Sequence, residues 1–531
     1  AGSALEKVPV GLGAKQRLAV MQFVAGPMLR DHPRQLSPSG GQRIAAPANT
    51  PQPRYRFGVT HGDAWWAWSG DYALLVHGPT MNRDLPGKSL ALHCITLLAS
   101  TRPALVAPAH LRRKPALTPI TPSAHLADVR YEIRGALTRR ARELEAAGLD
   151  IIKLNIGNPG RYGFEAPAHL REAIASHLHD SEAYGHEQGL ELAREAIAAQ
   201  QRARGAQAVE PERIFIGNGV SELIDLSLRA LLHPGEEVLL PSPDYPLWSA
   251  ATILNGGQPR YYRCLASNNH LPDPDEIEAL ITPRTRALVL INPNNPTGAV
   301  YPRALLQQLV AIAARHRLLL LADEIYDEIL YDGATFQPLA EVAGELPCLS
   351  FGGLSKVHRA CGYRVGWMSL SGDPARTADY RDALQLLAAL RLCANVTAQW
   401  AVPPALQSAP TIGALTAPGG RLHEARRIVL EAVAASEYLQ LVAPDGALYA
   451  FPQVRADRIA GFDDEAFALR LLEEESVLVV PGSSFNVPLS RHFRLTLLPP
   501  PAQLHEVFVR IERVLARMAR EQTPAPAAAL A

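Results

Sequence analysis

Only two lysines follow residue 120, Lys153 and Lys356, although the chain of 531 residues has 52 basic residues. Lys356 ends the segment Phe351–Lys356, Phe-Gly-Gly-Leu-Ser-Lys, which follows an apolar stretch typical of a buried strand. A lysine in such a position is partly desolvated, and a desolvated amine is a good nucleophile. The two glycines allow backbone to approach a flat ligand closely. Lys356 is therefore the candidate for amine chemistry, although a lysine taken alone is more often structural or simply exposed.

A carboxylate and a tyrosine follow another apolar run, Leu318 to Ala322, as Asp323 and Tyr326. In parallel sheets, ligands bind at the carboxyl ends of the strands, so Asp323 is expected to face the ligand crevice. A carboxylate that keeps a pyridine nitrogen protonated makes the ring an electron sink. Tyr326 is close enough to donate to a phenolate oxygen of such a ring. The alternative is an aspartate that caps a helix beside a packed tyrosine.

Two loops carry polar groups suited to the same ligand. Two prolines and a glycine constrain Asn292 to Gly298, and the amide of Asn295 is placed to bond the phenolate oxygen. Gly217 to Glu222 joins a predicted strand to a helix, and free N–H groups at a helix N-terminus bind phosphate. Ser221 adds a hydroxyl, and Arg364 is expected to add positive charge. Either loop alone also fits an ordinary tight turn.

Tyr245 and Arg494 complete the set of candidate side chains. Tyr245 follows the predicted strand at 237–240, where an aromatic ring can stack on a cofactor ring. Arg494 lies in the apolar segment Phe493 to Leu497. A lone arginine in an apolar strand needs a carboxylate partner, and a substrate α-carboxylate suits it.

Regular strand–helix alternation predicts an α/β fold with a mostly parallel central sheet that helices cover on both faces. The predicted strands are 213–216, 237–240, 287–291, 318–322 and 348–351, and the clearest helices are 221–232 and 304–315. The polar clusters follow the carboxyl ends of these strands. We predict that residues 166–375 form this large domain.

The C-terminal part predicts a smaller α+β domain. Its expected elements are a helical stretch over 376–400, strands at 446–453, 477–480 and 492–498, and an amphipathic helix over 502–520. Residues 376–520 therefore form the connecting helix and the small domain, and residues 123–165, with a helix expected over 129–148, are predicted to pack with it. Residues 521–531 read as a frayed tail.

Residues 1–122 are rich in Pro, Gly, Ser and Arg and lack sustained periodicity. Three interpretations stay open for this extension: a disordered or poorly packed segment, a targeting segment, or a small partner- or nucleic-acid-binding module.

Composition excludes several classes of function. The formal net charge is zero, which does not favour nucleic acid or an acidic membrane surface. The five cysteines have no CxxC spacing, so neither a disulfide frame nor a metal site is expected. No apolar run approaches the roughly 18 residues of a membrane span. We expect a cytoplasmic protein without bound metal, membrane or nucleic acid.

Together these residues resemble the fold-type-I, class I aminotransferases, which use pyridoxal 5'-phosphate. The resemblance covers about residues 123–520 and is closest to the bacterial glutamate–pyruvate (alanine) transaminase group. Further matching motifs are Tyr131–Gly135, Leu154–Pro159, Asp244–Trp248, Arg391–Val396 and Pro418–Leu422.

The resemblance implies a role for each matching residue. It implies that Lys356 holds the cofactor and acts as the base, that Asp323 pairs with the pyridine nitrogen, and that Tyr326 bonds the phenolate oxygen. Tyr245 would stack on the ring. The implied phosphate ligands are Gly219, Val220, Ser221, Ser355 and Arg364, and the implied substrate contacts are Gly157, Asn295, Arg494, Tyr131 and Arg134. Tyr184 matches a tyrosine that reaches the phosphate of a neighbouring subunit, which implies a homodimer.

The activity implied is ping-pong transfer of an α-amino group between alanine or glutamate and the 2-oxo acids pyruvate and 2-oxoglutarate. Two alternatives remain open. One is a different enzyme of this fold and cofactor, either another amino-acid aminotransferase or a carbon–sulfur β-lyase. The other is a transcription regulator that uses an aminotransferase-like domain as a ligand sensor.

Several positions depart from the family pattern. Gly352 stands where the family usually has Asn, and Val357 and His358 stand where it has Thr-Tyr. Cys361 also differs. Pro403 and Pro404 fall where the family continues a helix, so we predict that this helix ends or kinks there. These departures bear on substrate preference and rate, whereas the core acid–base residues match the family.

Overall fold

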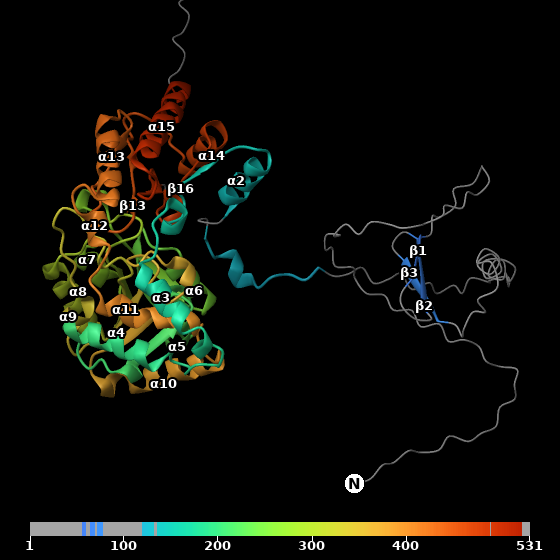
Figure 1. Ribbon diagram of the computed structural model, residues 1–531. Coiled ribbons are helices and arrows are strands. Elements are labelled where there is room, and N and C mark those ends of the chain that lie inside the picture. The colour runs from blue at the N-terminus through green and yellow to red at the C-terminus, as the bar shows by residue number, and fades with distance from the viewer. Residues whose placement is uncertain are drawn as a thin grey trace, which may run out of the picture. The chain divides into compact units, whose positions relative to one another are not determined.

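The computed structural model describes residues 119–131, 135–488 and 490–522, together with the backbone of three N-terminal strands. The chain divides into two units, residues 1–118 and 119–531 (Figure 1). In the first, β1 (Arg56–Val59), β2 (Ala64–Ser69) and β3 (Tyr72–His77) form an antiparallel sheet in that order. The other residues of the predicted extension before 119, Arg134 and the tail after 522 lie outside the described part. The three interpretations of the extension therefore remain predictions.

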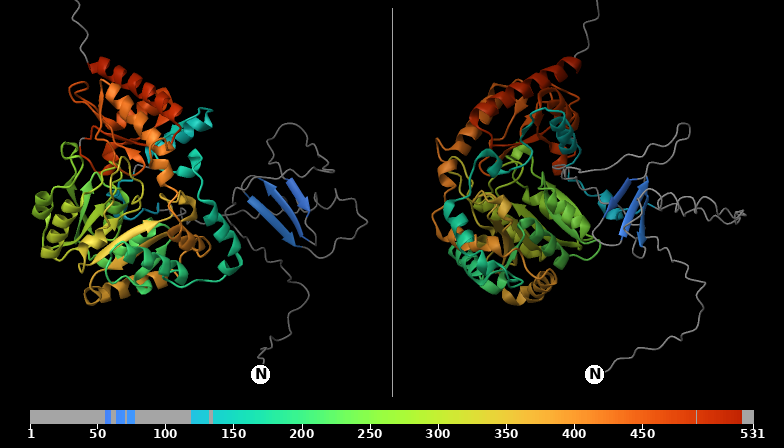
Figure 2. Two further views of the ribbon diagram at one scale, coloured as in Figure 1. Left: turned by 60° about the vertical axis from the view of Figure 1, so that its left-hand side comes forward. Right: turned by 45° about the vertical axis from the view of Figure 1, so that its right-hand side comes forward.

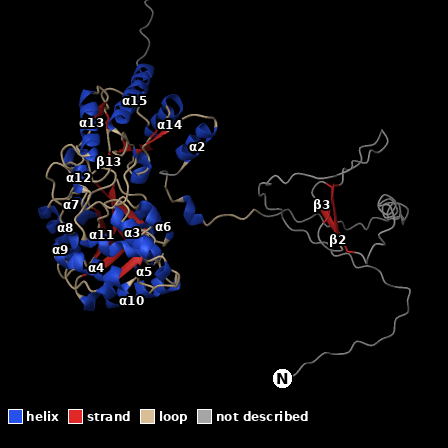
Figure 3. Cartoon of the chain, viewed as in Figure 1, coloured by secondary structure: helices blue, strands red, loops and turns tan. Residues whose placement is uncertain are grey.

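The second unit contains the predicted mostly parallel sheet, which is confirmed. It has seven strands, and only β11 runs antiparallel to its neighbours. Figure 3 shows the red strands of this unit enclosed by blue helices. In sheet order the strands are β5 (Ile214–Gly217), β11 (Gly366–Ser371), β10 (Cys348–Gly353), β9 (Leu319–Asp323), β8 (Thr285–Ile291), β6 (Glu237–Ser242) and β7 (Gln258–Arg263).

Helices cover both faces of this sheet, because successive strand side chains enter different cores. Ile214 and Ile216 pack on one face and Phe215 packs on the other. The first face carries α3 (Ala168–Ser176), α4 (Glu191–Ala203), α7 (Pro274–Leu280), α8 (Arg303–His316), α9 (Leu339–Ala343) and α11 (Val402–Gln407) (Figure 2). The second carries α5 (Val220–Leu231), α6 (Leu247–Leu254) and α10 (Pro374–Leu390). The central strands are therefore mostly apolar and almost entirely buried, whereas the edge strand β7 is not.

A separate apolar core holds the C-terminal elements together with the segment before residue 165. There β4 (Ile152–Lys153) pairs in parallel with β15 (Val477–Leu478), and α2 (Ala136–Ala146) packs on α14 (Asp464–Glu475). The other elements are α12 (Gly413–Thr416), α13 (Arg421–Ala435), α15 (Pro501–Gln522), β12 (Leu439–Gln440), β13 (Tyr449–Ala450), β14 (Gln453–Val454), β16 (Val480–Pro481) and β17 (Phe493–Thr496). Figure 1 shows these helices gathered at one end of the unit. The exact domain boundaries stay predictions.

Some predicted boundaries differ from the structure. The helical stretch expected over 376–400 ends at Leu390. Leu392 has a φ of 68°, a value that does not occur inside a right-handed helix. Pro403 and Pro404 lie in the first turn of α11. Proline is tolerated there, because backbone N–H groups in the first turn have no acceptor within the helix, so their absence breaks no hydrogen bond. The helix expected over 129–148 begins only at Ala136. Strands β7 and β11 were not predicted, because β7 is a half-exposed edge strand and β11 breaks the β-α-β alternation.

Candidate active site

The side chains expected at the carboxyl ends of the strands lie close together. Asp323 ends β9, and Lys356 follows β10, its neighbour in the sheet. The Lys356 Nζ donates to the carbonyl oxygen of Gly157 at 2.9 Å and lies 5.9 Å from the centre of the Tyr326 ring. Lys356, Asp323 and Tyr326 therefore face one space, as expected for a shared ligand.

Asp323 is a buried carboxylate with one oxygen open. Its Oδ2 accepts from the Trp248 indole Nε1 at 3.1 Å, and its Oδ1 has no partner among the described residues. Burial raises the pKa of Asp323, while the bond from Trp248, a bond from the Ile325 backbone N–H and the charge of Lys356 oppose that rise. A buried acceptor without a donor is costly, so the site suits a ligand that brings an N–H group.

The loop before α5 forms an anion cradle. Gly219 has a φ of +86° and precedes Val220, the first residue of α5, whose N-terminal N–H groups are free to bind an anion. Arg364 donates to the carbonyl oxygen of Asn218 at 3.1 Å. Ser221 is exposed in the first turn of α5. Helix N–H groups, a hydroxyl and a guanidinium therefore meet where the phosphate was expected.

Arg494 is a buried cation without a carboxylate. It is 2% exposed, and its Nη1 donates to Asn295 Oδ1 at 2.9 Å. It also donates to the carbonyl oxygen of Asn155. Its guanidinium lies between two rings, 4.3 Å from the centre of Tyr449 and 4.8 Å from that of Phe485. No ion pair of Arg494 occurs within residues 119–131, 135–488 and 490–522, so its charge suits an anionic ligand.

A family model described as aminotransferase class I and II matches residues 150–511. The chain belongs to this family. The aminotransferase is 46% identical to glutamate-pyruvate aminotransferase AlaA of Escherichia coli over 383 residues, which are 72% of this chain and 95% of that protein. It is 45% identical to an alanine aminotransferase of Mycobacterium tuberculosis over 394 residues, 74% of this chain and 92% of the relative.

Solved structures give the same assignment. An aminotransferase from Escherichia coli superposes with a TM-score of 0.74 at 44% identity, covering 75% of this chain and 99% of the other. An alanine aminotransferase from Pyrococcus furiosus gives 0.71 at 33% identity, covering 75% and 100%. The predicted family and fold class are therefore confirmed.

The remaining predicted site residues occupy different surroundings. Tyr131 reaches the site, because its hydroxyl lies 3.2 Å from that of Tyr245 and its ring packs near Phe451 and Phe485. Tyr184 is 82% exposed, so it is free to contact another molecule. Ser355 is half-buried beside Lys356, and Arg134 lies outside the described residues.

Two further residues, for which the sequence predicts no role, lie at the site. Trp248 stands in a motif that was noted, yet its bond to Asp323 joins residues 75 positions apart. Tyr449 accepts a hydrogen bond from the Tyr326 hydroxyl at 3.1 Å and lies against Arg494. A tyrosine in an apolar strand gave no signal beyond that of a core residue.

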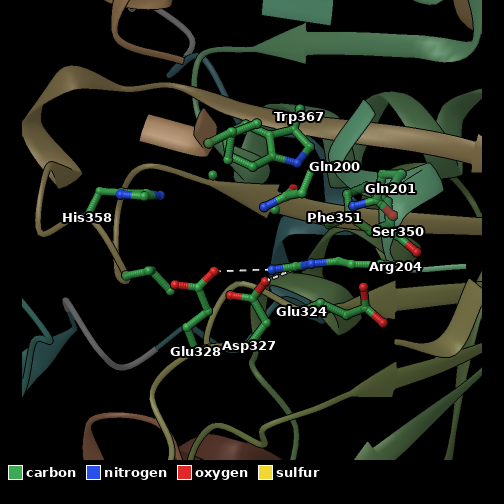
Figure 4. Close-up of a pocket in the computed structure, with 14 residues that line it drawn as sticks. Gln200, Gln201, Arg204, Glu324, Asp327, Glu328, Ser350, Phe351, His358 and Trp367 are labelled. Atoms are coloured by element: carbon green, nitrogen blue, oxygen red, sulfur yellow. Dashed lines mark hydrogen bonds and ion pairs between the residues drawn. The ribbon is translucent and has the colours of Figure 1, made fainter. Parts of the chain in front are cut away.

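Three of the departures from the family pattern line one small cavity on the side of the sheet away from Asp323. Gly352, Val357 and His358 surround about 20 Å³, room for roughly one water molecule. Figure 4 shows Arg204 beside it, bonded to Asp327 at 2.6 Å and to Glu328 at 3.2 Å. None of the predicted site residues lines this cavity, so these departures alter packing beneath the Lys356 segment.

Neither a membrane helix nor a metal cluster appears in the part of the chain that the structure describes. No described helix is long and apolar enough to cross a membrane. No group of three or more His, Cys, Asp or Glu side chains in this part is arranged to hold a metal ion.

Replacing Gly219 by alanine should weaken cofactor binding at least about tenfold, because the change perturbs a charged hydrogen-bonding site. A Cβ at position 219 would lie 2.2 Å from Arg364 Nη2, and the φ of +86° disfavours any side chain. Gly235 is a matched control, since it has a φ of +83° with nothing within 4 Å of its Cβ position. Calorimetric titration with pyridoxal phosphate measures both variants. Equal affinities would show that the Gly219 loop does not bind the phosphate.

Proposed function

We propose that this aminotransferase binds pyridoxal 5'-phosphate and transfers an α-amino group between alanine or glutamate and 2-oxo acids. The observation that carries the proposal is the convergence of an amine, an open buried carboxylate oxygen and an anion cradle. Lys356, Asp323 Oδ1 and the Gly219–Arg364 cradle supply them. The names of the relatives support the substrates.

Each part of the cofactor has a matching group in the chain. Lys356 would hold it covalently, and Asp323 Oδ1 would accept from its pyridine N–H. The Tyr326 hydroxyl and the Asn295 amide nitrogen would donate to its phenolate oxygen, since Asn295 Oδ1 already accepts from Arg494. Tyr245 would stack on the ring. The phosphate ligands would be Gly219, Val220, Ser221, Ser355 and Arg364.

Pyridoxal phosphate, when bound, withdraws electrons from the substrate so that the proton on its Cα becomes acidic. The chain's own residues move that proton and orient the substrate. Arg494 and the backbone at Gly157 hold the α-carboxylate, which fixes the Cα–H bond relative to the ring. The Lys356 Nζ would take the Cα proton as a general base, hold it as an ammonium group, and deliver it on the other side of the substrate nitrogen. Asp323 keeps the pyridine nitrogen protonated throughout.

A substrate screen tests the proposed function. Purified protein loaded with the cofactor is given alanine and 2-oxoglutarate, and pyruvate and glutamate are measured. Cysteine conjugates are offered in parallel, with sulfide as the readout. We expect turnover of alanine that depends on 2-oxoglutarate. Sulfide release without any need for a 2-oxo acid would instead identify a β-lyase.

We also propose that the protein acts as a homodimer in which Tyr184 reaches the phosphate of the partner's site. The 82% exposure of Tyr184 supports this arrangement, because no contact within its own protomer covers the ring. Three leucines around the end of α10 are also exposed, namely Leu386, Leu390 and Leu392 at 62%, 74% and 59%. Apolar side chains this exposed suit burial against a second copy.

Mixing two impaired variants, Tyr184→Ala and Lys356→Ala, should restore activity. In a mixed dimer, the Tyr184→Ala protomer keeps Lys356 and receives the partner's Tyr184, so one site is intact. Subunit exchange at equal concentrations should therefore give about a quarter of the wild-type activity. Turnover of alanine at limiting cofactor is the measurement. Lys356→Ala mixed with Asp323→Asn should gain nothing, since both changes affect a protomer's own site, and a gain there would contradict the shared-site arrangement.

A further inference from the structure

Tyr449 occupies the centre of the site, although the proposed cofactor contacts leave it without a role. It lies in β13, which pairs with β17, the strand that carries Arg494. The side chain is 3% exposed, and the Arg494 guanidinium lies 4.3 Å from the centre of its ring. Its ring also meets that of Tyr326 edge to face. The backbone pairing therefore holds the phenol next to the cation expected to bind the substrate carboxylate.

The Tyr449 hydroxyl has one of its hydrogen-bonding functions open. The Tyr326 hydroxyl donates to it at 3.1 Å. Whether the Tyr326 proton lies toward Tyr449, as in this structure, or is given to the phenolate oxygen of the cofactor, as proposed above, Tyr449 keeps its own proton for a further acceptor. The hydroxyl also lies beside Gly157, because a Cβ built on Gly157 would be 2.3 Å from that oxygen. Gly157 therefore needs to lack a side chain, and the Tyr449 hydroxyl lies beside the backbone that is proposed to contact the substrate.

The charges around Tyr449 favour an anionic acceptor. Burial opposes ionisation of the phenol, but the positive charges of Lys356 and Arg494 outweigh it and lower the pKa of Tyr449. The bond from Tyr326 acts in the same direction, and the Cys361 thiol opposes it. A phenol with a lowered pKa is a strong hydrogen-bond donor. The cations Lys356 and Arg494 and the Tyr449 hydroxyl thus all favour a negatively charged ligand next to Tyr449.

Building on the proposed function, we propose that Tyr449 is a further catalytic residue, whose hydroxyl donates to the α-carboxylate of the substrate beside Arg494. Every 2-amino acid and every 2-oxo acid carries this carboxylate. Tyr449 therefore contributes equally to both halves of the reaction and does not select among side chains. Its contribution belongs to binding, whereas Lys356 moves the proton.

The test compares three single-hydroxyl deletions in the full, cofactor-loaded protein. Tyr449→Phe removes the proposed donor but keeps the ring beneath Arg494. Tyr326→Phe leaves the donor, but it removes the hydroxyl that bonds Tyr449 together with the proposed bond to the cofactor's phenolate oxygen. Tyr331→Phe is the matched control, because Tyr331 is also buried and the Arg426 guanidinium lies 5.3 Å from the centre of its ring. Its hydroxyl donates to the carbonyl oxygen of Ala447 at 3.0 Å. Thermal melts establish that each variant is folded.

Two readouts are measured, the KM values for alanine and 2-oxoglutarate and the affinity for propionate by calorimetry. Propionate has the carboxylate but no amino group, so its binding needs no turnover. Tyr449→Phe should raise both KM values and the propionate Kd by about tenfold, the effect of one hydrogen bond to a charged group, with kcat little changed. Tyr326→Phe should raise the propionate Kd by a smaller factor, and Tyr331→Phe should leave it unchanged.

Unchanged propionate affinity in Tyr449→Phe would overturn the inference, as would an equal loss in Tyr331→Phe. A fall in kcat without a change in KM would also overturn it, since that pattern assigns Tyr449 to proton transfer. If the wild-type protein does not transaminate at all, the proposed function fails, and the propionate measurement still decides whether Tyr449 binds a carboxylate.

Discussion

Replacing Lys356 by alanine should reduce transamination by at least about 10⁴-fold, because one change removes both the nucleophile and the general base. The Lys356 Nζ is the amine that faces Asp323 and Tyr326, and it is held by the Gly157 carbonyl oxygen at 2.9 Å. The visible absorbance band of the lysine-bound cofactor should disappear as well. Turnover of alanine with 2-oxoglutarate and an absorbance spectrum of the loaded protein are the two measurements.

The chain offers a matched control in Lys153, the other lysine after residue 120. Its Nζ pairs with Glu145 at 2.6 Å, and its side chain is 32% exposed, away from the ligand groups. Lys153→Ala should keep wild-type turnover and lose at most about 1 kcal/mol of stability, as is usual for a partly exposed ion pair. Retention of the absorbance band in Lys356→Ala would falsify the assignment of this lysine.

The parts of the site that follow strand ends were predictable from sequence. Parallel strands bring their carboxyl ends to one edge of the sheet, so apolar runs followed by Asp323, Asn295 and Lys356 already predict that these residues converge. The same reasoning covers Gly219, because a glycine between a strand and a helix predicts an anion site. Roles beyond this convergence came from the resemblance to a family, and they stay predictions.

The parts that depend on packing between distant segments were not predictable. Trp248 comes from α6 and reaches the site through its hydrogen bond to Asp323. Tyr449 comes from β13 and reaches it through its hydrogen bond with Tyr326. No periodicity separates such residues from ordinary core aromatics. Likewise, Arg494 was expected to bind a carboxylate, but only the packed structure shows two aromatic rings in place of a protein carboxylate around it.

Asp323→Asn should lower turnover by about 10³-fold, comparable with removal of a preorganised charge in other active sites. The asparagine oxygen still accepts from Trp248, whose Nε1 lies 3.1 Å from Asp323 Oδ2. The amide no longer holds a proton on the pyridine nitrogen, so the ring loses its strength as an electron sink. Steady-state turnover of alanine measures this effect. The cofactor should remain bound, because Lys356 and the Gly219 loop are unchanged.

Glu324→Gln is the matched control, one residue further along the chain. Glu324 is also buried, which raises its pKa to about 8, but it lines the cavity near Arg204 and accepts from the Leu339 N–H at 2.8 Å. Its side chain lies on the far side of the strand end from the cofactor groups. We expect turnover within about threefold of wild type, since no group that touches the substrate or cofactor is changed.

The two effects of Asp323→Asn should have opposite signs, which separates a functional carboxylate from a structural one. Burial raises the pKa of Asp323, so above its ordinary pKa the native state retains a proton that the unfolded chain has released. Native stability then falls as pH rises through that interval, and a neutral asparagine avoids the loss. The cofactor-free variant should therefore melt at a higher temperature than wild type at pH 8 while being nearly inactive with cofactor. A variant that is both inactive and less stable would show that Asp323 holds the fold together, and the pyridine nitrogen would need another partner.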